Sequence, residues 1–313
     1  MKILITGGNG FVGKYLSKIL HEEFPKFNIY SNPFDITDQE LVYDIVNKIN
    51  PDICFHLAAV SSVRIAEENP ENAWNVNLHG TLNLARILYK KNKKVIFIFA
   101  SSAEIYGKSF CQRTALDEMT LLEPMSTYAC TKSAADLALG AMALNGLHVI
   151  RLRLFNHTGM GQNPNFVVPS FIDQIVRIEA GLQKPVLSVG NLNAERDFLD
   201  VIDVCEVYKR LIIHSSQIDS GTILNICSGY TRSILSIVYD IINISNVKVD
   251  IFVDPRKYRS LDIPYESGTA QRAMRILEWK PRITWDKTIK NMLMHSRINY
   301  KIYNENKVYK SYI

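Results

Sequence analysis

The chain has 313 residues, of which 47% are hydrophobic and 21% are charged. This length and composition are ordinary for a globular protein with a large buried core, in one large domain or two modest ones. The 36 basic and 31 acidic residues give a formal charge of +5 and are spread along the sequence. We therefore expect a mild attraction toward anionic small molecules and no binding of nucleic acid.

The cysteines and the apolar runs give no sign of export or of a membrane. The five cysteines lack CxxC spacing and sit mostly in apolar runs, which is typical of reduced, buried thiols in a cytoplasmic protein. No apolar run is long enough to cross a bilayer, so we expect no membrane association. No spacing of histidine, cysteine or carboxylate residues indicates a metal site.

A glycine-rich turn follows the first predicted strand. Residues 2–6 form an apolar run, and a helical pattern starts near Val12. Between them, Gly7, Gly10 and Gly13 permit positive φ angles, let the backbone approach a pyrophosphate, and allow close packing of helix on strand. This strand, turn and helix predict a dinucleotide-binding site at the start of the chain.

The second predicted strand leaves the choice of cofactor open. Residues 28–31 read as a strand, and Asp35 follows after a shorter connection than a doubly wound fold normally has. No acidic residue ends this strand to bind a ribose 2′-hydroxyl, and no arginine follows it to bind a 2′-phosphate. Asp35 itself has two interpretations: a contact on the adenine side of the cofactor, or the cap of a helix that begins near Asp38.

Two later strands end in residues that suit a ligand site. Residues 52–59 form a buried strand with small residues at its end, where a cofactor can lie close to the backbone. We interpret His56, within this strand, as a hydrogen-bonded histidine rather than a catalytic one. Residues 95–100 are typical of a central parallel strand, and Ser101 and Ser102 follow at the carboxyl end, where ligands bind in open α/β sheets.

A Tyr-x-x-x-Lys tetrad lies further along, in residues 125–132. Residues four apart share one face of a helix, so the phenol of Tyr128 and the ammonium of Lys132 can reach one cleft. A nearby positive charge favours the ionised phenol, which makes Tyr128 a better acid-base group. On its own this spacing is most often a solvated helix face, and only the other motifs give it a chemical meaning.

The amino-acid composition of the sequence changes after residue 155. Residues 156–166 are rich in glycine, asparagine and proline, which predicts a loop that opens toward a ligand. A predicted helix at 166–181 and a predicted strand at 185–190 follow, and residues 191–198 turn back toward the sheet. This interleaving predicts a second region packed over the first rather than a separate domain on a linker.

Together these patterns predict an α/β fold, a Rossmann-type doubly wound parallel sheet with a smaller, interleaved C-terminal α/β substrate-binding region. The dinucleotide-binding domain is expected at residues 1–160, with return strands from about 190–228. The smaller region is expected at about 161–189 and 229–313.

The order of these motifs resembles the extended short-chain dehydrogenase/reductase family of nucleotide-sugar enzymes, from Met1 to about Trp285. The resemblance implies that Tyr128 exchanges the proton at the sugar O4, that Lys132 lowers its pKa and holds the nicotinamide ribose, and that Ser102 hydrogen-bonds O4. This is chemically consistent, because transfer of hydride at C4 changes the charge on O4.

The implied cofactor is NADP or NAD, with a slight preference for NADP. The residues expected to bind it are Gly7, Asn9, Gly10, Phe11, Val12, Gly13, Asp35, Ile36, Leu57, Ala58, Ala59, Asn77, Ser101, Tyr128, Lys132 and Leu154.

Residues 153–162, 166–168 and 189–198 resemble the GDP-sugar branch of this family. The resemblance implies a GDP-sugar substrate whose diphosphate is bound by Asn156, Arg196 and Arg259, with Ser102, Val167 and Asn191 also in the substrate site. Arginine suits this role because its planar fork binds phosphate oxygens in pairs. Taken alone, Arg196 is also compatible with a surface salt bridge and Arg259 with a solvated charge.

The reaction implied is the reduction of the C4 ketone of a GDP-4-keto-6-deoxy-hexose, of the GDP-4-keto-6-deoxy-mannose to GDP-rhamnose type. Glu104 stands where the dehydratases of the family place the base that removes the C5 proton, so a GDP-mannose 4,6-dehydratase or a nucleotide-sugar 4-epimerase is the alternative. Ser102 and Ala103 stand where dehydratases usually have Thr and then Asp or Ser, which favours the reductase.

A catalytically silent NAD(P)-binding protein is a further alternative, although the presence of Ser102, Tyr128 and Lys132 together counts against it. The family also suggests a homodimer formed through two helices of each subunit.

Overall fold

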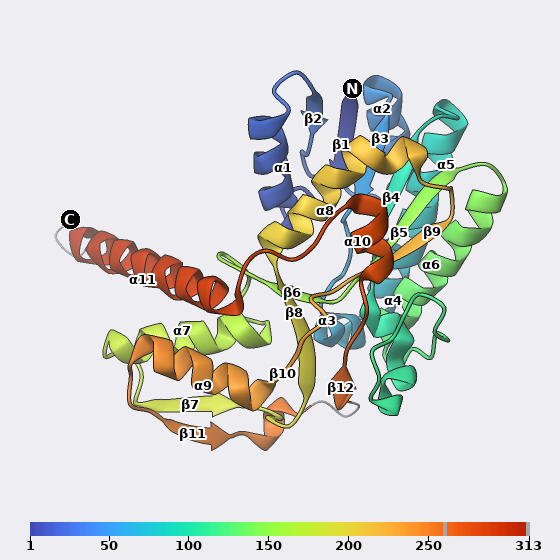
Figure 1. Cartoon of the computed structure of the whole chain (residues 1–313). Helices are drawn as coiled ribbons and strands as arrows, with labels where there is room; N and C mark the ends of the chain where they lie inside the picture. Colours follow the sequence, from blue (N-terminus) through green and yellow to red (C-terminus); the bar gives the residue numbers. More distant parts are fainter. Residues whose placement is uncertain (259–261, 311–313) are drawn as a thin grey trace.

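The computed structural model describes residues 1–258 and 262–310, with side chains described as far as residue 300. Its centre is a sheet of six parallel strands, in the order β2-β1-β3-β4-β5-β9 (Figure 1). The strands are β1 (Lys2–Thr6), β2 (Asn28–Tyr30), β3 (Ile53–His56), β4 (Ile96–Ser102), β5 (His148–Leu154) and β9 (Thr222–Ile226). The predicted Rossmann-type doubly wound fold is confirmed, and its topological switch point lies between β1 and β3.

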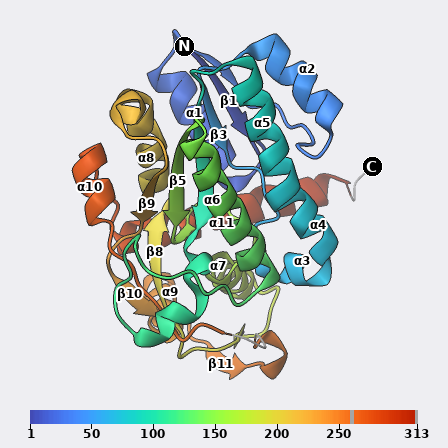
Figure 2. The same cartoon turned by 90° about the vertical axis from the view of Figure 1, so that its right-hand side faces the viewer.

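Helices cover both faces of this sheet, so its central strands are buried on both sides and read as continuous apolar runs. Figure 2 shows α2, α5 and α6 together on one face. The helices of the two faces are α2 (Gln39–Ile49), α5 (Thr81–Lys91) and α6 (Thr127–Leu144) on one side, and α1 (Phe11–Glu23), α8 (Val201–His214) and α10 (Gln271–Leu277) on the other.

The sheet ends at the short strand β2, and the chain then passes through residues 31–38 directly into α2. The cap of this helix is Asp38, whose side chain accepts a hydrogen bond from the Leu41 amide at 3.0 Å. Asp35 is therefore not the cap: it accepts from the amide and the hydroxyl of Thr37, at 2.8 and 2.7 Å. It stays exposed, and its pKa is lowered by these two bonds.

His56 lies fully buried at the end of β3, between two hydroxyl groups. Its Nδ1 is 2.6 Å from Thr6 Oγ1 and its Nε2 is 2.8 Å from Thr81 Oγ1. Burial lowers the pKa of His56 to about 3, so the ring is neutral at physiological pH. The prediction of a hydrogen-bonded histidine is confirmed.

The segment between β3 and β4 contains α3 (Val63–Glu68), α4 (Pro70–Trp74) and a π-helical turn, η1 (Asn75–Gly80), that continues into α5. After β4 comes the 3-10 segment η2 (Ala103–Gln112), which begins at the N-cap Ser102. The Ser102 hydroxyl accepts from the Glu104 amide at 3.2 Å. The carboxyl end of β4 is thus tied to the segment that carries Glu104.

A second region lies below the large sheet in Figure 1 and has an apolar core of its own. Two parallel strands and three helices form this core: β7 (Val186–Val189), β11 (Asp250–Val253), α7 (Val167–Glu179), α9 (Ile234–Ser245) and α11 (Trp285–Lys310). Two short 3-10 turns, η3 (Ser215–Gln217) and η4 (Pro255–Lys257), follow α8 and β11. The domain boundaries stay a prediction. One part of the predicted smaller region, α10, packs on α8 and β9 of the large region.

The two regions meet at a small sheet around β8 (Glu195–Asp200). This strand pairs in parallel with β6 (Asn156–Thr158) and β12 (Tyr265–Glu266), and antiparallel with β10 (Thr231–Ser233). Figure 1 shows β6 and β8 between the two regions. Residues far apart in the sequence are thereby brought beside the carboxyl end of β5.

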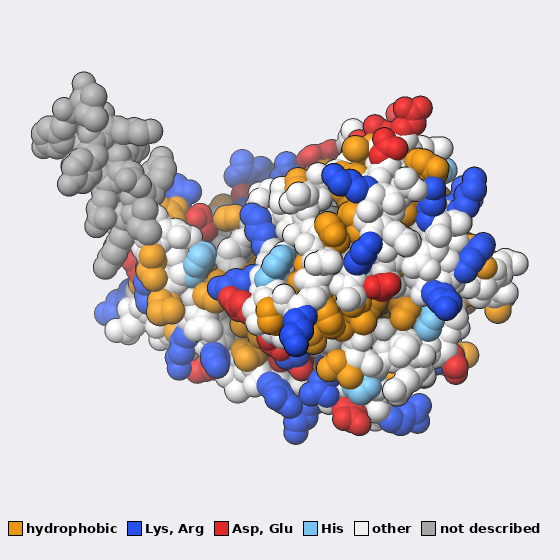
Figure 3. Space-filling model, turned by 90° about the horizontal axis from the view of Figure 1, so that it is seen from above, with side chains coloured by type: hydrophobic (Ala, Val, Ile, Leu, Met, Phe, Trp, Pro, Cys, Tyr) orange, Lys and Arg blue, Asp and Glu red, His pale blue; other side chains and the backbone are white. Residues whose placement is uncertain are grey.

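All five cysteines are free; Cys54, Cys205 and Cys227 are buried, Cys130 is half-buried and Cys111 is exposed. The expected burial therefore holds for three of them. Lys and Arg side chains are interspersed with Asp and Glu on the face shown in Figure 3, in agreement with the scattered charge of the sequence. Over the part of the chain that the structure describes, no helix is long and apolar enough to span a membrane.

Candidate active site

The glycine-rich turn lies at the switch point, where the backbone of β1 passes close to the end of β3. Gly7 has φ of +70°, and a Cβ on it would lie 2.8 Å from the Ala58 amide nitrogen. A Cβ on Gly13 would lie 2.8 Å from the Gly8 Cα and closer still to the Gly7 carbonyl oxygen. Helix α1 can therefore approach β1 only because these positions carry no side chain.

Three features of this turn and of the neighbouring strand ends fit a dinucleotide. The N-cap of α1 is Gly10, which supplies no side-chain acceptor for the first amides of the helix, so these amides are suited to bind a pyrophosphate. Leu57, Ala58 and Ala59 are half-buried at the end of β3. Ser101 Oγ, at the end of β4, is buried and has no hydrogen-bond partner among the described residues, which suits a group that a ligand completes.

The other residues predicted to bind the cofactor differ in exposure. Asn9 and Asp35 are exposed, and Phe11, Val12 and Leu154 are half-buried. The Ile36 side chain is buried in the core, so only its backbone is left to face a ligand.

Asn77 is fully buried, and its amide is used inside the protein. It donates to the Val60 carbonyl at 3.1 Å and to Thr131 Oγ1 at 3.0 Å, and it accepts from the Val60 amide at 2.8 Å. Both of its hydrogens are thus bonded to protein atoms. Its observed contacts hold the loop after β3 against α6.

Helix α6 brings Tyr128 to the end of β4. The helix is capped by Ser126, which accepts from the Ala129 amide at 3.1 Å, so that Tyr128 lies in its first turn. Tyr128 is half-buried, and the Ser102 hydroxyl lies close enough to its phenol to lower the pKa of the phenol. The structure thus brings together two of the predicted catalytic groups, from segments 26 positions apart in the sequence.

The pKa of Tyr128 differs from the expected lowering. Burial raises it to about 12, with further increases from the charges of Glu104 and Glu266, and the hydrogen bond from Ser102 lowers it only in part. The phenol is therefore neutral at pH 7. A neutral phenol is the form that donates a proton to a ketone oxygen as it is reduced.

Lys132 lies one turn further along α6 and is almost fully buried. Its Nζ donates to the Ala100 carbonyl of β4 at 2.5 Å and lies 4.2 Å from the centre of the Phe99 ring. Burial lowers the pKa of Lys132 to about 7, while the charge of Asp136 raises it. The ammonium is thus fixed at the end of β4, on the same side of α6 as Tyr128.

A buried ionic network holds α6 and η2 against the sheet. Asp136 is fully buried on α6 and accepts from Arg151 Nη1 at 3.1 Å and from Arg153 Nη2 at 3.2 Å, both on β5. Arg153 also donates to the Tyr106 hydroxyl of η2 at 3.0 Å, and Tyr106 donates to Asn225 Oδ1 of β9 at 2.7 Å. The elements that carry Tyr128, Lys132 and Glu104 therefore share one set of bonds.

The predicted substrate residues lie on the elements around β8. Arg196 is buried and forms an ion pair with Asp262, with 2.7 Å between Nη2 and Oδ1. Asn191 Nδ2 donates to the other oxygen of Asp262, also at 2.7 Å. Val167 is exposed at the start of α7. Arg259 lies outside the described residues.

Two acidic residues of this region were not predicted from the sequence. Asp262 bridges Arg196 and Asn191, and Glu266 is fully buried on β12, opposite Arg196 in the strand pairing. Asp262 stands in the same stretch as Arg259, which was a usable signal, but its partner lies 66 positions earlier in the chain. Nothing local distinguishes Glu266 from a solvated residue of a short strand.

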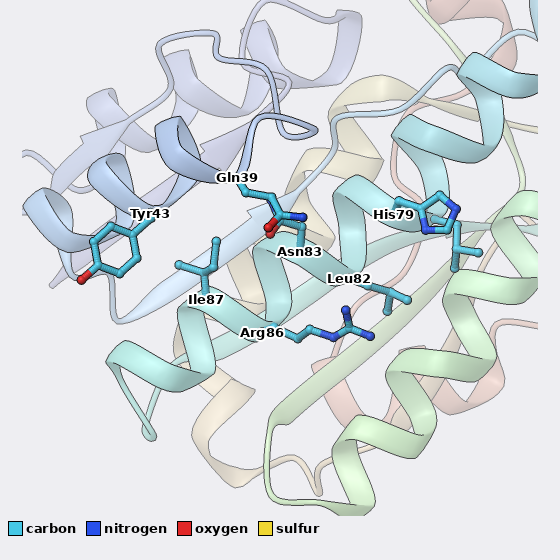
Figure 4. A pocket seen from close by; sticks show the side chains of 8 residues that line it. Gln39, Tyr43, His79, Leu82, Asn83, Arg86 and Ile87 are labelled. Carbon is cyan, nitrogen blue, oxygen red and sulfur yellow. The ribbon is translucent and has the colours of Figure 1, made fainter.

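A groove of about 600 Å³ lies elsewhere, between α2 and α5 (Figure 4). Its lining includes Tyr43 of α2 and Asn83, Arg86 and Ile87 of α5. It contains none of Ser102, Tyr128 or Lys132, so it is separate from the chemical centre described above. No group of His, Cys, Asp and Glu side chains in the described residues is arranged to hold a metal ion.

The chain is similar to known proteins over nearly its whole length. The model of the family GDP-mannose 4,6 dehydratase matches residues 22–292. The chain is 32% identical to GDP-6-deoxy-D-mannose reductase of Pseudomonas aeruginosa, over 93% of this chain and 96% of that protein. It is also 32% identical to GDP-6-deoxy-D-talose 4-dehydrogenase of Aggregatibacter actinomycetemcomitans, over 95% of this chain and 98% of that protein.

The fold has solved counterparts as well. A structure of RMD from Pseudomonas aeruginosa complexed with NADPH superposes with a TM-score of 0.87 at 30% identity, and the match covers 95% of this chain and 99% of that one. The likeness extends over both regions of the molecule.

Proposed function

Because this chain belongs to the GDP-mannose 4,6-dehydratase family of extended short-chain dehydrogenases/reductases, we propose that it reduces the C4 ketone of a GDP-4-keto-6-deoxy-hexose with NADPH or NADH. The product would be of the GDP-rhamnose type. The observation that carries the proposal is the close approach of Ser102 and Tyr128 at the carboxyl end of β4. Relatives that act on GDP-6-deoxy-hexoses, at 32% identity over nearly the whole chain, support it.

The roles of the chain's residues follow from the negative charge that develops on the sugar O4 during reduction. The bound cofactor supplies a hydride to the sugar C4, and O4 becomes negative as this happens. Tyr128, which is neutral at pH 7, donates its proton to O4, and the Ser102 hydroxyl donates a hydrogen bond to the same oxygen. Lys132 binds the Ala100 carbonyl of β4, one helical turn from Tyr128, and its protonated form would favour the phenolate that forms as the proton is transferred.

We propose NADPH as the preferred cofactor, on the likeness to the NADPH complex of RMD. The glycine turn would hold the pyrophosphate against the first amides of α1, and Ser101 Oγ would find its missing partner in the ligand. The end of β2 does not add to this argument, because neither Tyr30 nor Asp35 bears a positive charge that could bind the 2′-phosphate of NADPH. Competitive binding of the two cofactors tests this preference.

We propose that Arg196, with Asn156, binds the diphosphate of the substrate. Replacing Arg196 by Lys removes the planar fork, and we expect the KM for the GDP-sugar to rise about tenfold or more, since hydrogen bonds to charged groups contribute about 1.5–3 kcal/mol. The Kd for NADPH should not change. The control is Arg113→Lys, which changes an exposed arginine that pairs with Glu195 at 2.8 Å. An Arg196→Lys enzyme with an unchanged KM would show that the diphosphate binds elsewhere.

Glu104 and the nearby Glu266 carboxyl favour one alternative, a 4,6-dehydratase, because elimination of water requires a base at C5. Simple reduction does not require it. We expect that incubation with GDP-mannose, without added reductant, yields no 4-keto product detectable by mass spectrometry. A 4-keto product that disappears in Glu104→Gln would establish the dehydratase instead.

We also propose a homodimer that forms in the cytoplasm. Two exposed leucines of α6, Leu137 and Leu144, support an interface on this helix, and the buried thiols suit a reducing compartment. Sedimentation equilibrium of the wild type and of Leu137→Glu tests the dimer.

A further inference from the structure

Glu266 is a buried acid that the proposed reduction does not use. It lies on β12, opposite Arg196 of β8, with 1% of its surface exposed. Its Oε2 is 3.3 Å from Arg196 Nε, yet among the described residues this oxygen has no hydrogen-bond partner. A buried carboxylate with such weak compensation costs free energy, so its presence calls for a reason beyond packing.

A second incomplete group faces it. Asn156 Nδ2 is buried and also lacks a hydrogen-bond partner in the described part of the chain. The Asn156 amide is close enough to Glu266 to lower the pKa of its carboxyl. Asn156 and Glu266 therefore lie close together beside the arginine proposed to bind phosphate, and neither Asn156 Nδ2 nor Glu266 Oε2 has a hydrogen bond of good geometry among the described residues, which points to a ligand that completes them.

Arg196 already forms ion pairs with two carboxylates. Its Nη2 is 2.7 Å from Asp262 Oδ1, its Nε is 3.3 Å from Glu266 Oε2, and its Nη1 donates to the Glu195 carbonyl at 2.9 Å. The diphosphate of a GDP-sugar would add two negative charges beside these carboxylates. Because the site is largely buried, repulsion is strong unless one acid becomes neutral.

We propose that Glu266 is a positioning residue that takes up a proton from solvent when the diphosphate of a GDP-sugar binds, so that Arg196 exchanges an internal carboxylate partner for the phosphate. In its protonated form Glu266 also becomes a hydrogen-bond donor at the edge of the site. This inference rests on the proposed function, and it adds that substrate binding is linked to pH.

The charged groups around Glu266 support this. Burial and the charge of Glu104, from η2, raise the pKa of Glu266 to about 7; Asp197 of β8 raises it further, whereas Arg196 and the Asn156 amide lower it. The charge of Glu266 also raises the pKa of Tyr128, on α6. The diphosphate of a bound GDP-sugar would raise the pKa of Glu266 further, because its negative charge disfavours the carboxylate. Proton uptake is therefore greatest above pH 7, where the free carboxyl is ionised, and vanishes at lower pH, where it is already protonated.

Isothermal titration calorimetry with GDP-mannose tests the proposal. Both phosphates of GDP-mannose are diesters and do not titrate near neutral pH, so protons counted in buffers of different ionisation enthalpy come from the protein. We expect uptake of a large fraction of one proton at pH 8 and almost none at pH 5.5. The Kd should rise above pH 7, by at most about tenfold per pH unit.

In Glu266→Gln we expect binding without proton uptake and a Kd that no longer rises with pH. The matched control is Glu195→Gln, the same change one residue before Arg196 on β8, where the carboxylate pairs with Arg113; it should take up protons as the wild type does. If Glu266→Gln does not fold, proton uptake by the wild type still tests the proposal. In Glu104→Gln the uptake should begin at lower pH, because the charge of Glu104 raises the pKa of Glu266.

Wild-type binding without proton uptake, or unchanged uptake in a folded Glu266→Gln protein, would overturn the proposal. If GDP-mannose does not bind at any pH although NADPH binds, the GDP-sugar assignment fails first and this inference falls with it. The two failures are therefore distinguishable.

Discussion

Replacement of Tyr128 by Phe should lower kcat by about 10²–10⁴-fold, because it removes the proton donor for O4 and leaves the ring in place. The Kd for NADPH should stay within a few-fold of the wild-type value, since the glycine turn and Ser101 are untouched. Stopped-flow oxidation of NADPH and a separate binding titration measure the two quantities.

Tyr239→Phe is the control for this substitution, because it removes the same oxygen from an exposed tyrosine of α9 and should leave kcat unchanged. A Tyr128→Phe enzyme with a rate within tenfold of the wild type would mean that another group protonates O4. Loss of NADPH binding in this variant would instead mean that the phenol holds the cofactor.

Replacement of Gly13 by Ala should weaken NADPH binding more than tenfold and destabilise the protein by about 1–3 kcal/mol. The added Cβ meets the Gly8 Cα at 2.8 Å and comes even closer to the Gly7 carbonyl oxygen. These are backbone atoms that cannot rotate away, so α1 must move from β1 and the amides at its start move with it. Cofactor titration and thermal unfolding measure the two effects.

Lys18→Ala, on the exposed side of the same helix, is the control and should change stability by less than about 0.5 kcal/mol. Wild-type affinity for NADPH in a folded Gly13→Ala protein would show that the cofactor does not depend on the close approach of α1 to β1.

The parts of the fold that could be predicted are those whose signal is local. The strand before Gly7, the helix after it, and the apolar run before Ser101 each specify their structure within a few residues. The short link to Asp35 correctly pointed to a trimmed edge, and the sheet ends at β2. The meeting of Ser102 and Tyr128 needed the resemblance to a family, because no periodicity links a strand end to a distant helix.

What could not be predicted depends on pairing between distant segments. Glu266 faces Arg196 only because β12 pairs with β8, and Asp136 meets Arg151 only because α6 lies over β5. The predicted direction of the Tyr128 pKa was also wrong, because the sequence shows the spacing to Lys132 but not the burial and the nearby carboxylates that raise this pKa.

The most direct test of the proposed reaction follows the transferred hydrogen. The purified protein is incubated with GDP-4-keto-6-deoxy-mannose and NADPH that carries deuterium at C4 of the nicotinamide, and the product is examined by NMR. We expect a GDP-6-deoxy-hexose with deuterium at the sugar C4 and one NADPH consumed per product. An unchanged ketone, or a product without deuterium at C4, would contradict reduction by this protein.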